Sequence, residues 1–173
     1  MGRLNLDFYT RDVLEVAPDL LGCNIIIKGL TGLQSFAITE VEAYRGEEDL
    51  ACHASKGKTS RNQAMYLDGG HVYVYLIYGM YWMLNIVTGL SGHPQAVLIR
   101  SVRGCNGPGR VGRLLGIDKS FYAEYLVLSE RLWLESGMQV RENEIIHTNR
   151  IGIDYAGVWK EKPWRYVWQA GID

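Results

Sequence analysis

The chain contains few cysteines and no long apolar run, and each shortage excludes a class of protein. Its three cysteines, Cys23, Cys52 and Cys105, are widely spaced and form no CxxC pair, so neither a zinc cage nor a thioredoxin motif is predicted. The sequence has no stretch of 18 apolar residues that would predict a membrane-spanning helix. The first residues lack the apolar segment of a secretory signal, so we expect no membrane partner and a reducing, cytoplasmic location.

The sequence also lacks the strong positive charge of many nucleic-acid-binding proteins, because its formal net charge is −1. The charges are unevenly distributed, however. Between residues 50 and 117 there is one acid, and the basic residues are Lys56, Lys58, Arg61, Arg100, Arg103, Arg110 and Arg113. This basic segment can form one positive face for DNA, or its charges can scatter over the surface, and the sequence leaves both possibilities open.

Internal repeats, low-complexity tracts and linkers are absent, so we expect a single compact domain over residues 1–173. The residue patterns predict helices over residues 10–21, 47–54, 60–67 and 110–115. They predict strands over residues 24–28, 36–44, 71–78, 81–88, 96–102, 131–135, 150–154 and 165–168. Several connections are too short for crossovers between parallel strands. The sequence therefore predicts an α+β fold, with a curved, largely antiparallel β-sheet flanked by short helices.

Two carboxylates and an aromatic residue alternate along one predicted strand. Glu40, Glu42 and Tyr44 share a face, and the two carboxylates are about 7 Å apart at the backbone. Paired carboxylates at such spacing can serve as the acid and base of a glycosidase. The alternative is a solvated strand face that carries acids at every second position.

A second strand is rich in tyrosine. Tyr73 and Tyr75 share one face of this strand, whereas Tyr78 has the opposite parity and precedes Gly79 at a turn. Such residues can pack in a sheet, or they can stack on a flat, ring-shaped substrate. His53 alone is weak support for catalysis. A carboxylate among aromatic faces nevertheless favours chemistry on a nucleobase, which must leave its stack before an enzyme can reach it.

A glycine-rich loop follows the strand predicted at 96–102. Gly107-Pro108-Gly109-Arg110 leads into a predicted helix and can offer backbone N–H groups and a cation to a phosphate. It is not a Walker loop and lacks the GxGxxG context. The alternative is an ordinary loop with a helix start.

Several segments occur in the order found in a known family. They are Ile38-Thr39-Glu40-Val41-Glu42-Ala43-Tyr44, His53, Arg61-Asn62, Tyr73-Val74-Tyr75-Leu76-Ile77-Tyr78-Gly79-Met80-Tyr81, Asn85, Ala96-Val97-Leu98-Ile99-Arg100, Asn106-Gly107-Pro108 and Arg150-Ile151-Gly152. Together they closely resemble the alkyladenine (3-methyladenine) DNA glycosylase family, and the likeness covers nearly the whole chain. Each segment alone is unspecific, whereas their combination in this order is highly specific.

The resemblance implies a base-excision-repair enzyme that flips damaged purines out of duplex DNA and hydrolyses the N-glycosidic bond, leaving an abasic site. The damaged purines of the family are 3-methyladenine, other alkylpurines, hypoxanthine and ethenoadenine. By position, Glu42 resembles the general base that activates water, and Arg100 resembles the arginine beside it. The residues that resemble the walls around the flipped base are Tyr44, His53 and Tyr75.

The resemblance also implies how DNA is held. Asn85 resembles the residue that disfavours the 2-amino group of guanine, and Tyr78 resembles a side chain that intercalates into DNA from the tip of a β-hairpin. Contacts with the DNA backbone are expected from Arg61, Gly107, Gly109 and Arg110. The expected partner is double-stranded DNA containing damaged purines, bound by a monomer in a bacterial-type cytoplasm, associated with the nucleoid.

The same resemblance implies a monofunctional enzyme. No lysine lies next to the catalytic motif, so we expect hydrolysis without a Schiff base or lyase activity, and we expect no cofactor and no metal. One departure from the family is a short segment: only residues 101–106 separate Arg100 from Gly107, where members carry a longer, helix-bearing segment.

Two other functions compete with this hypothesis. A non-catalytic damaged-DNA-binding module would keep the basic face but would need no carboxylate among its aromatic residues. A small-substrate nucleosidase would use Glu40 and Glu42 together, and its activity would show little dependence on salt.

Overall fold

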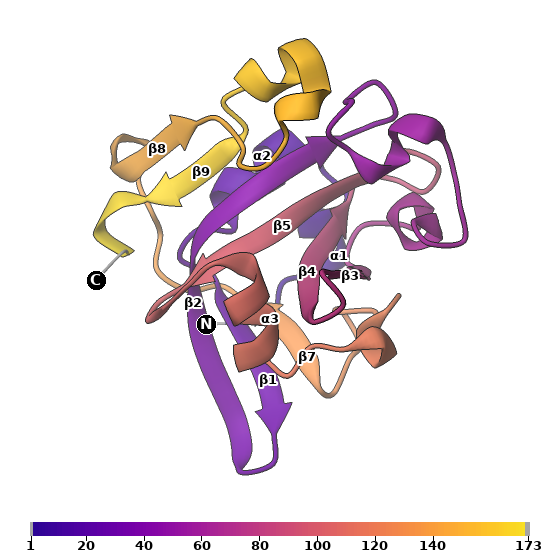
Figure 1. Cartoon of the computed structure of the whole chain (residues 1–173). Coiled ribbons are helices and arrows are strands. Elements are labelled where there is room, and N and C mark those ends of the chain that lie inside the picture. The colour runs from indigo at the N-terminus through magenta and orange to yellow at the C-terminus, as the bar shows by residue number, and fades with distance from the viewer. Residues whose placement is uncertain (1, 172–173) are drawn as a thin grey trace.

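The computed structural model describes residues 2–171 and has an α+β fold (Figure 1). Its strands are β1 Asn24–Gly29, β2 Gly32–Arg45, β3 Val72–Ile77, β4 Tyr81–Thr88, β5 Gln95–Val102, β6 Cys105–Asn106, β7 Leu132–Glu135, β8 Ile145–Thr148 and β9 Arg165–Trp168. The main order is β3-β4-β5-β2-β1-β7, while β6 pairs with β5, and β9 pairs with both β2 and β8. The strand pairings are antiparallel. The predicted fold class is therefore confirmed.

The helices are short. The α-helices are α1 Leu6–Tyr9, α2 Val13–Asp19 and α3 Pro108–Leu114, and the 3-10 helices are His53–Lys56, Gln63–Tyr66, Lys119–Phe121, Glu142–Glu144, Asp154–Glu161 and Gln169–Gly171. The side chain of Asp12 caps α2 by accepting a hydrogen bond from the N–H of Leu14. Within residues 2–171, no helix has the length and apolarity needed to cross a bilayer.

The main core lies on one face of the sheet, against α2 and α3. Along β2, Val41 and Ala43 point into this core together with Val16 of α2 and Val111 of α3. Alternation along a strand sends neighbouring side chains to the opposite face. The face that carries Glu42 is consequently separate from the main core.

Two predicted elements were wrong. The segment predicted as a helix over 47–54 forms turns instead, because the Asp49 carboxylate accepts hydrogen bonds from the backbone N–H groups of Arg45 and Ala51. The strand predicted over 150–154 is also absent: Gly152 has a left-handed φ of 75°, and the helical turns of Asp154–Glu161 follow. Strand β8 was not predicted, because it is short and gains its partners only from β9.

Near the short segment noted in the sequence, the chain makes a tight hairpin. Val102 pairs with Cys105, so that Arg103 and Gly104 alone form the turn between β5 and β6. Helix α3 then packs closely on β4, since a Cβ at Gly112 would lie 2.0 Å from the carbonyl oxygen of Trp82. The chain therefore passes from β5 to α3 without an intervening helix.

Candidate active site

A pocket of about 260 Å³ opens on the sheet face opposite the main core. Strand register forms its floor: Glu42 of β2 lies opposite Leu98 of β5, which lies opposite Asn85 of β4, which lies opposite Tyr73 of β3. Directly opposed residues in antiparallel strands share a face. The volume lies just below the usual range for ligand pockets, about 300–1,000 Å³, and suits one ring system.

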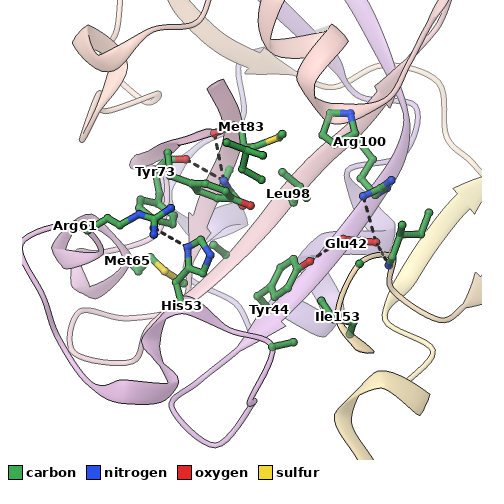
Figure 2. Close-up of a pocket in the computed structure, with 18 of the residues that line it drawn as sticks. Glu42, Tyr44, His53, Arg61, Met65, Tyr73, Met83, Leu98, Arg100 and Ile153 are labelled. Atoms are coloured by element: carbon green, nitrogen blue, oxygen red, sulfur yellow. Dashed lines mark hydrogen bonds and ion pairs between the residues drawn. The ribbon is translucent and has the colours of Figure 1, made fainter. Parts of the chain in front are cut away.

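Glu42 is completely buried and lies at one wall of this pocket. Its Oε2 accepts a hydrogen bond from the Tyr44 hydroxyl at 2.8 Å, and its Oε1 accepts one from the N–H of Ile151 at 2.7 Å (Figure 2). Burial raises the pKa of Glu42, although Arg100, these two hydrogen bonds and Arg150 oppose that effect. A carboxylate with a raised pKa is a stronger base towards a nearby water.

Arg100 of β5 lies beside Glu42. Its Nη1 is 3.5 Å from Glu42 Oε1, and its Nε donates a hydrogen bond to Glu40 Oε1 at 3.0 Å. Glu40, Glu42 and Tyr44 therefore share one strand face, as the alternation predicted. Burial of Glu40 disfavours its charged form, but hydrogen bonds from Arg165 and Ser101 and the charge of Arg100 outweigh this and lower its pKa.

Aromatic side chains form the other walls. Tyr44 and His53 lie across an open space from each other (Figure 2). The His53 ring contacts Tyr75 with centroids 4.5 Å apart, and its Nδ1 is 2.8 Å from the hydroxyl of Tyr73. Burial and the charge of Arg61 lower the pKa of His53 to about 4. Because the ring faces the open pocket, we expect water to weaken this effect until a base fills the space.

Sequence comparisons identify the family of the chain. Residues 7–105 and 102–171 match the methylpurine-DNA glycosylase (MPG) family. The chain belongs to this family. It is thus a DNA glycosylase, a hydrolase of DNA repair. The two matched stretches meet at the tight turn between β5 and β6, where the chain has its short segment.

Individual relatives cover nearly the whole chain. A protein of Methanocella arvoryzae is 42% identical over 92% of this chain and 89% of its own length. One of Natranaerobius thermophilus is 35% identical over 95% of this chain and 94% of its own length. One of Anaeromyxobacter sp. is 40% identical over 95% of this chain and 88% of its own length. Each carries the name "Putative 3-methyladenine DNA glycosylase".

The structure places two more predicted residues of this glycosylase, Asn85 and Arg61, in the lining of the pocket. Asn85 is buried in the floor, where its Nδ2 donates to the carbonyl oxygens of Tyr73 at 3.2 Å and Met83 at 3.4 Å. Arg61 lines the pocket with its guanidinium over the Tyr75 ring, so it lies closer to the base site than the sequence indicated. The predicted roles of both residues stay predictions.

Tyr78 lies at the turn between β3 and β4 and is 88% exposed. Its φ of 52° is left-handed, which costs a non-glycine residue roughly 1–2 kcal/mol. Strained backbone of this kind often occurs at functional sites. The structure confirms an exposed aromatic at the hairpin tip, and its insertion into DNA stays a prediction.

The residues of the glycine-rich loop that were predicted to contact the DNA backbone lie outside the pocket. Of residues 107–110, Pro108 alone lines the pocket. Gly109 has a packing role, since a Cβ there would lie 2.8 Å from the Tyr81 ring. Gly107 precedes α3, and Arg110 is exposed on it. Contact of these residues with DNA stays a prediction.

Some of the residues that support Glu42 were not found from the sequence. Arg150 binds both carboxylate oxygens of Asp49, at 2.6 and 2.9 Å, and donates to the carbonyl oxygen of Ala43. This anchors the segment that presents the N–H of Ile151 to Glu42. The Arg150-Ile151-Gly152 match to the family was a signal for this segment, but it did not reveal the partner.

Other contributors to the pocket were also missed. Met65 and Met83 line it, and Tyr155 lies at its exposed side. Tyr73, which the sequence offered with Tyr75 as a packing or stacking residue, also lines it. Among residues 2–171, no group of three or more His, Cys, Asp and Glu side chains could hold a metal ion.

Proposed function

We propose that the pocket receives a damaged purine flipped out of duplex DNA and that Glu42 activates the water that replaces it. The buried position of Glu42 among aromatic walls carries this proposal. Such a site can stack a flat base and hold a base-activated water at its edge. The substrates are 3-methyladenine, other alkylpurines, hypoxanthine and ethenoadenine.

In the reaction, water loses a proton to Glu42 while its oxygen attacks C1′ of the deoxyribose. The bond between C1′ and the purine nitrogen breaks, and its electron pair leaves with the base. A purine alkylated on a ring nitrogen carries positive charge, so it leaves as a neutral base, whereas neutral hypoxanthine and ethenoadenine leave as anions that take up a proton from water. An abasic site remains in both cases. The carboxylate also stabilises the positive charge that develops on the sugar.

Base flipping is energetically feasible with these side chains. Extrusion of a base costs a few kcal/mol and less when the base is damaged. Stacking on an aromatic side chain contributes about 1–3 kcal/mol per base. Tyr44, His53 and Tyr75 would stack on the flipped base, and Tyr78 would fill the vacated space. The electron-rich tyrosine rings also attract a positively charged purine.

Selectivity and product follow from the remaining lining. Asn85, held rigidly in the floor, would disfavour the 2-amino group of guanine. No lysine is among the described residues that line the pocket, which supports hydrolysis without a Schiff base. We expect a monomer that acts on nucleoid DNA and leaves the strand unbroken.

The small-substrate nucleosidase receives less support from the geometry. Glu40 accepts hydrogen bonds from Arg100, Arg165 and Ser101, so its carboxylate is not available as a second acid or base. Only an activity assay distinguishes a glycosylase from a non-catalytic DNA-binding module.

The test is incubation of the protein with duplexes that contain one hypoxanthine, ethenoadenine or 3-methylpurine, followed by alkali. Strand breaks that appear only after alkali, and that Glu42→Gln abolishes, are the expected result. Breaks without alkali would contradict the monofunctional mechanism. Retained DNA binding with no release from any lesion would favour the non-catalytic module.

A further inference from the structure

Glu40 has no role in the proposed reaction, although it lies two residues from Glu42 on the same face of β2. Its Oε1 accepts hydrogen bonds from Arg100 Nε at 3.0 Å and from Arg165 Nη1 at 2.9 Å. Its Oε2 accepts one from the Ser101 hydroxyl at 2.8 Å. A carboxylate that binds three donors is fixed in orientation and in charge.

Arg100 depends on Glu40 for its own orientation. The Nε edge of the guanidinium is bound to Glu40, whereas Nη1 faces Glu42 at 3.5 Å. Among residues 2–171, the side chain of Arg100 forms a hydrogen bond with Glu40 alone. Because a guanidinium is planar and rigid, holding one edge determines the direction of the other.

Arg165 extends the same network to the segment that precedes Ile151. Its Nε donates to the carbonyl oxygen of Asn149 at 2.9 Å, while its Nη1 binds Glu40. Asn149 lies two residues before Ile151, whose N–H binds Glu42. Glu40 is therefore connected to both groups that contact Glu42 Oε1.

We infer that Glu40 is a positioning residue for the hydrolytic step, which holds Arg100 at a distance from Glu42 and thereby keeps Glu42 basic. This inference rests on the proposed role of Glu42. The positive charges of Arg100 and Arg165 balance the negative charges of Glu40 and Glu42 in this network. Glu40 binds both arginines. Without the charge of Glu40, Arg100 would move onto Glu42, and the water would lose its base.

Several charged or titratable groups act on Glu42 from the elements around it. Tyr44 of β2, Tyr75 of β3, Arg100 of β5 and Arg150 after β8 interact with Glu42 electrostatically, and Glu40 of β2 and Arg165 of β9 are linked to it through Arg100. Glu40, Arg150 and Arg165 are not in direct contact with Glu42 and are not among the described residues that line the pocket, but Arg150 is already fixed in a buried pair with Asp49. Glu40 and Arg165 instead bind each other. Changes at these two residues are therefore the informative ones.

The experiment uses Glu40→Gln, which keeps the side-chain shape and removes the charge. We expect the single-turnover rate of base release from hypoxanthine DNA to fall roughly 10-fold to 100-fold, as misplaced catalytic groups do. The acidic limb of the pH–rate profile should move down by about one pH unit, because Glu42 loses a like charge and gains a cation. Arg165→Gln should move it upwards, because positive charge is lost.

Glu124→Gln is the matched control. Glu124 also accepts hydrogen bonds from an arginine, Arg131, and a serine, Ser129, but it does not line the pocket. This variant should lose thermal stability without a change in the pH–rate profile. The inference would be overturned if Glu40→Gln changed neither the rate nor the acidic limb of the pH–rate profile. It would also be overturned if Glu40→Gln lowered the rate without moving the acidic limb and lost as much stability as Glu124→Gln.

A second readout does not need activity. The carboxyl carbon of Glu42, labelled with ¹³C and assigned with Glu42→Gln, should titrate at lower pH in Glu40→Gln than in the parent protein. If no lesion is released, the proposed function fails while this titration still tests the network. An unchanged titration would overturn the coupling between Glu40 and Glu42.

Discussion

The pair Arg150–Asp49 and the pair Arg100–Glu42 meet at Tyr44, yet they are built differently. The Arg150 and Asp49 side chains are fully buried and only 2.6 Å apart, and the guanidinium lies between the rings of Tyr44 and Trp164. Arg100 and Glu42 are 3.5 Å apart, and Arg100 is exposed to the pocket. We call Arg150–Asp49 the closed pair, because it is shut off from the pocket, and Arg100–Glu42 the open pair, because it lines the pocket.

The difference separates a structural pair from a reactive one. In the closed pair, both carboxylate oxygens of Asp49 and both Nη groups of Arg150 bind protein groups, and among the described buried atoms of this pair only Nε of Arg150 lacks a hydrogen-bond partner. In the open pair, the long separation leaves the Nη groups of Arg100 and the carboxylate of Glu42 able to contact water and a substrate. A short ion pair there would stabilise the empty site at the expense of its chemistry.

The largest expected effect is at the open pair. Glu42→Gln should lower base release roughly 10²–10⁴-fold, because a general base is lost. Stability should be unchanged or higher, since a buried charge is removed while the amide can still accept the Ile151 N–H. Single-turnover kinetics measure the rate of base release, and urea unfolding measures stability. A marked loss of stability would contradict the view that the Arg100–Glu42 pair is reactive rather than structural.

At the closed pair the effect should appear in stability instead. Asp49→Asn should lower the free energy of unfolding by roughly 3–5 kcal/mol, because Arg150 is left buried without its counter-ion. The control is Asp19→Asn in the exposed pair with Arg11, which should cost about 1 kcal/mol or less. Equal losses in urea unfolding would refute the distinction.

The contrast extends to the backbone at the hairpin tip. Tyr78→Gly should raise the free energy of unfolding by up to about 1 kcal/mol, because the left-handed φ suits glycine. Base release should fall about 10-fold through lost stacking with DNA. Ala123→Gly, the control at φ 62°, should leave base release unchanged. Stabilisation of Tyr78→Gly with full activity would remove Tyr78 from the proposed mechanism.

The smallest effect is expected at the residue between the two pairs. The Tyr44 hydroxyl donates to Glu42 and so favours its ionised form. Tyr44→Phe should raise the pKa of Glu42 further, and the acidic limb of base release should move to higher pH by up to about one unit. Tyr66→Phe, which removes an exposed hydroxyl bound to Glu47, is the control. A limb that moves to lower pH would contradict this account.

Much of the fold and part of the site were predictable from local pattern. Alternation along β2 placed Glu40, Glu42 and Tyr44 on one face, and the tyrosine-rich run ended in a hairpin with Tyr78 at its tip. These features follow from the two-residue repeat of a strand and from turn residues. The family resemblance pointed to the same positions.

Tertiary structure alone decided which groups act on those residues. Ile151 reaches Glu42 across 109 residues of sequence, Arg165 reaches Glu40 across 125, and Arg150 reaches Asp49 across 101. The turns that stand in place of the predicted helix over 47–54 are held by Asp49, whose carboxylate binds both nearby backbone N–H groups and the distant Arg150. Backbone geometry determines side-chain direction within a segment, whereas buried charges and N–H groups find their partners only when distant segments pack together.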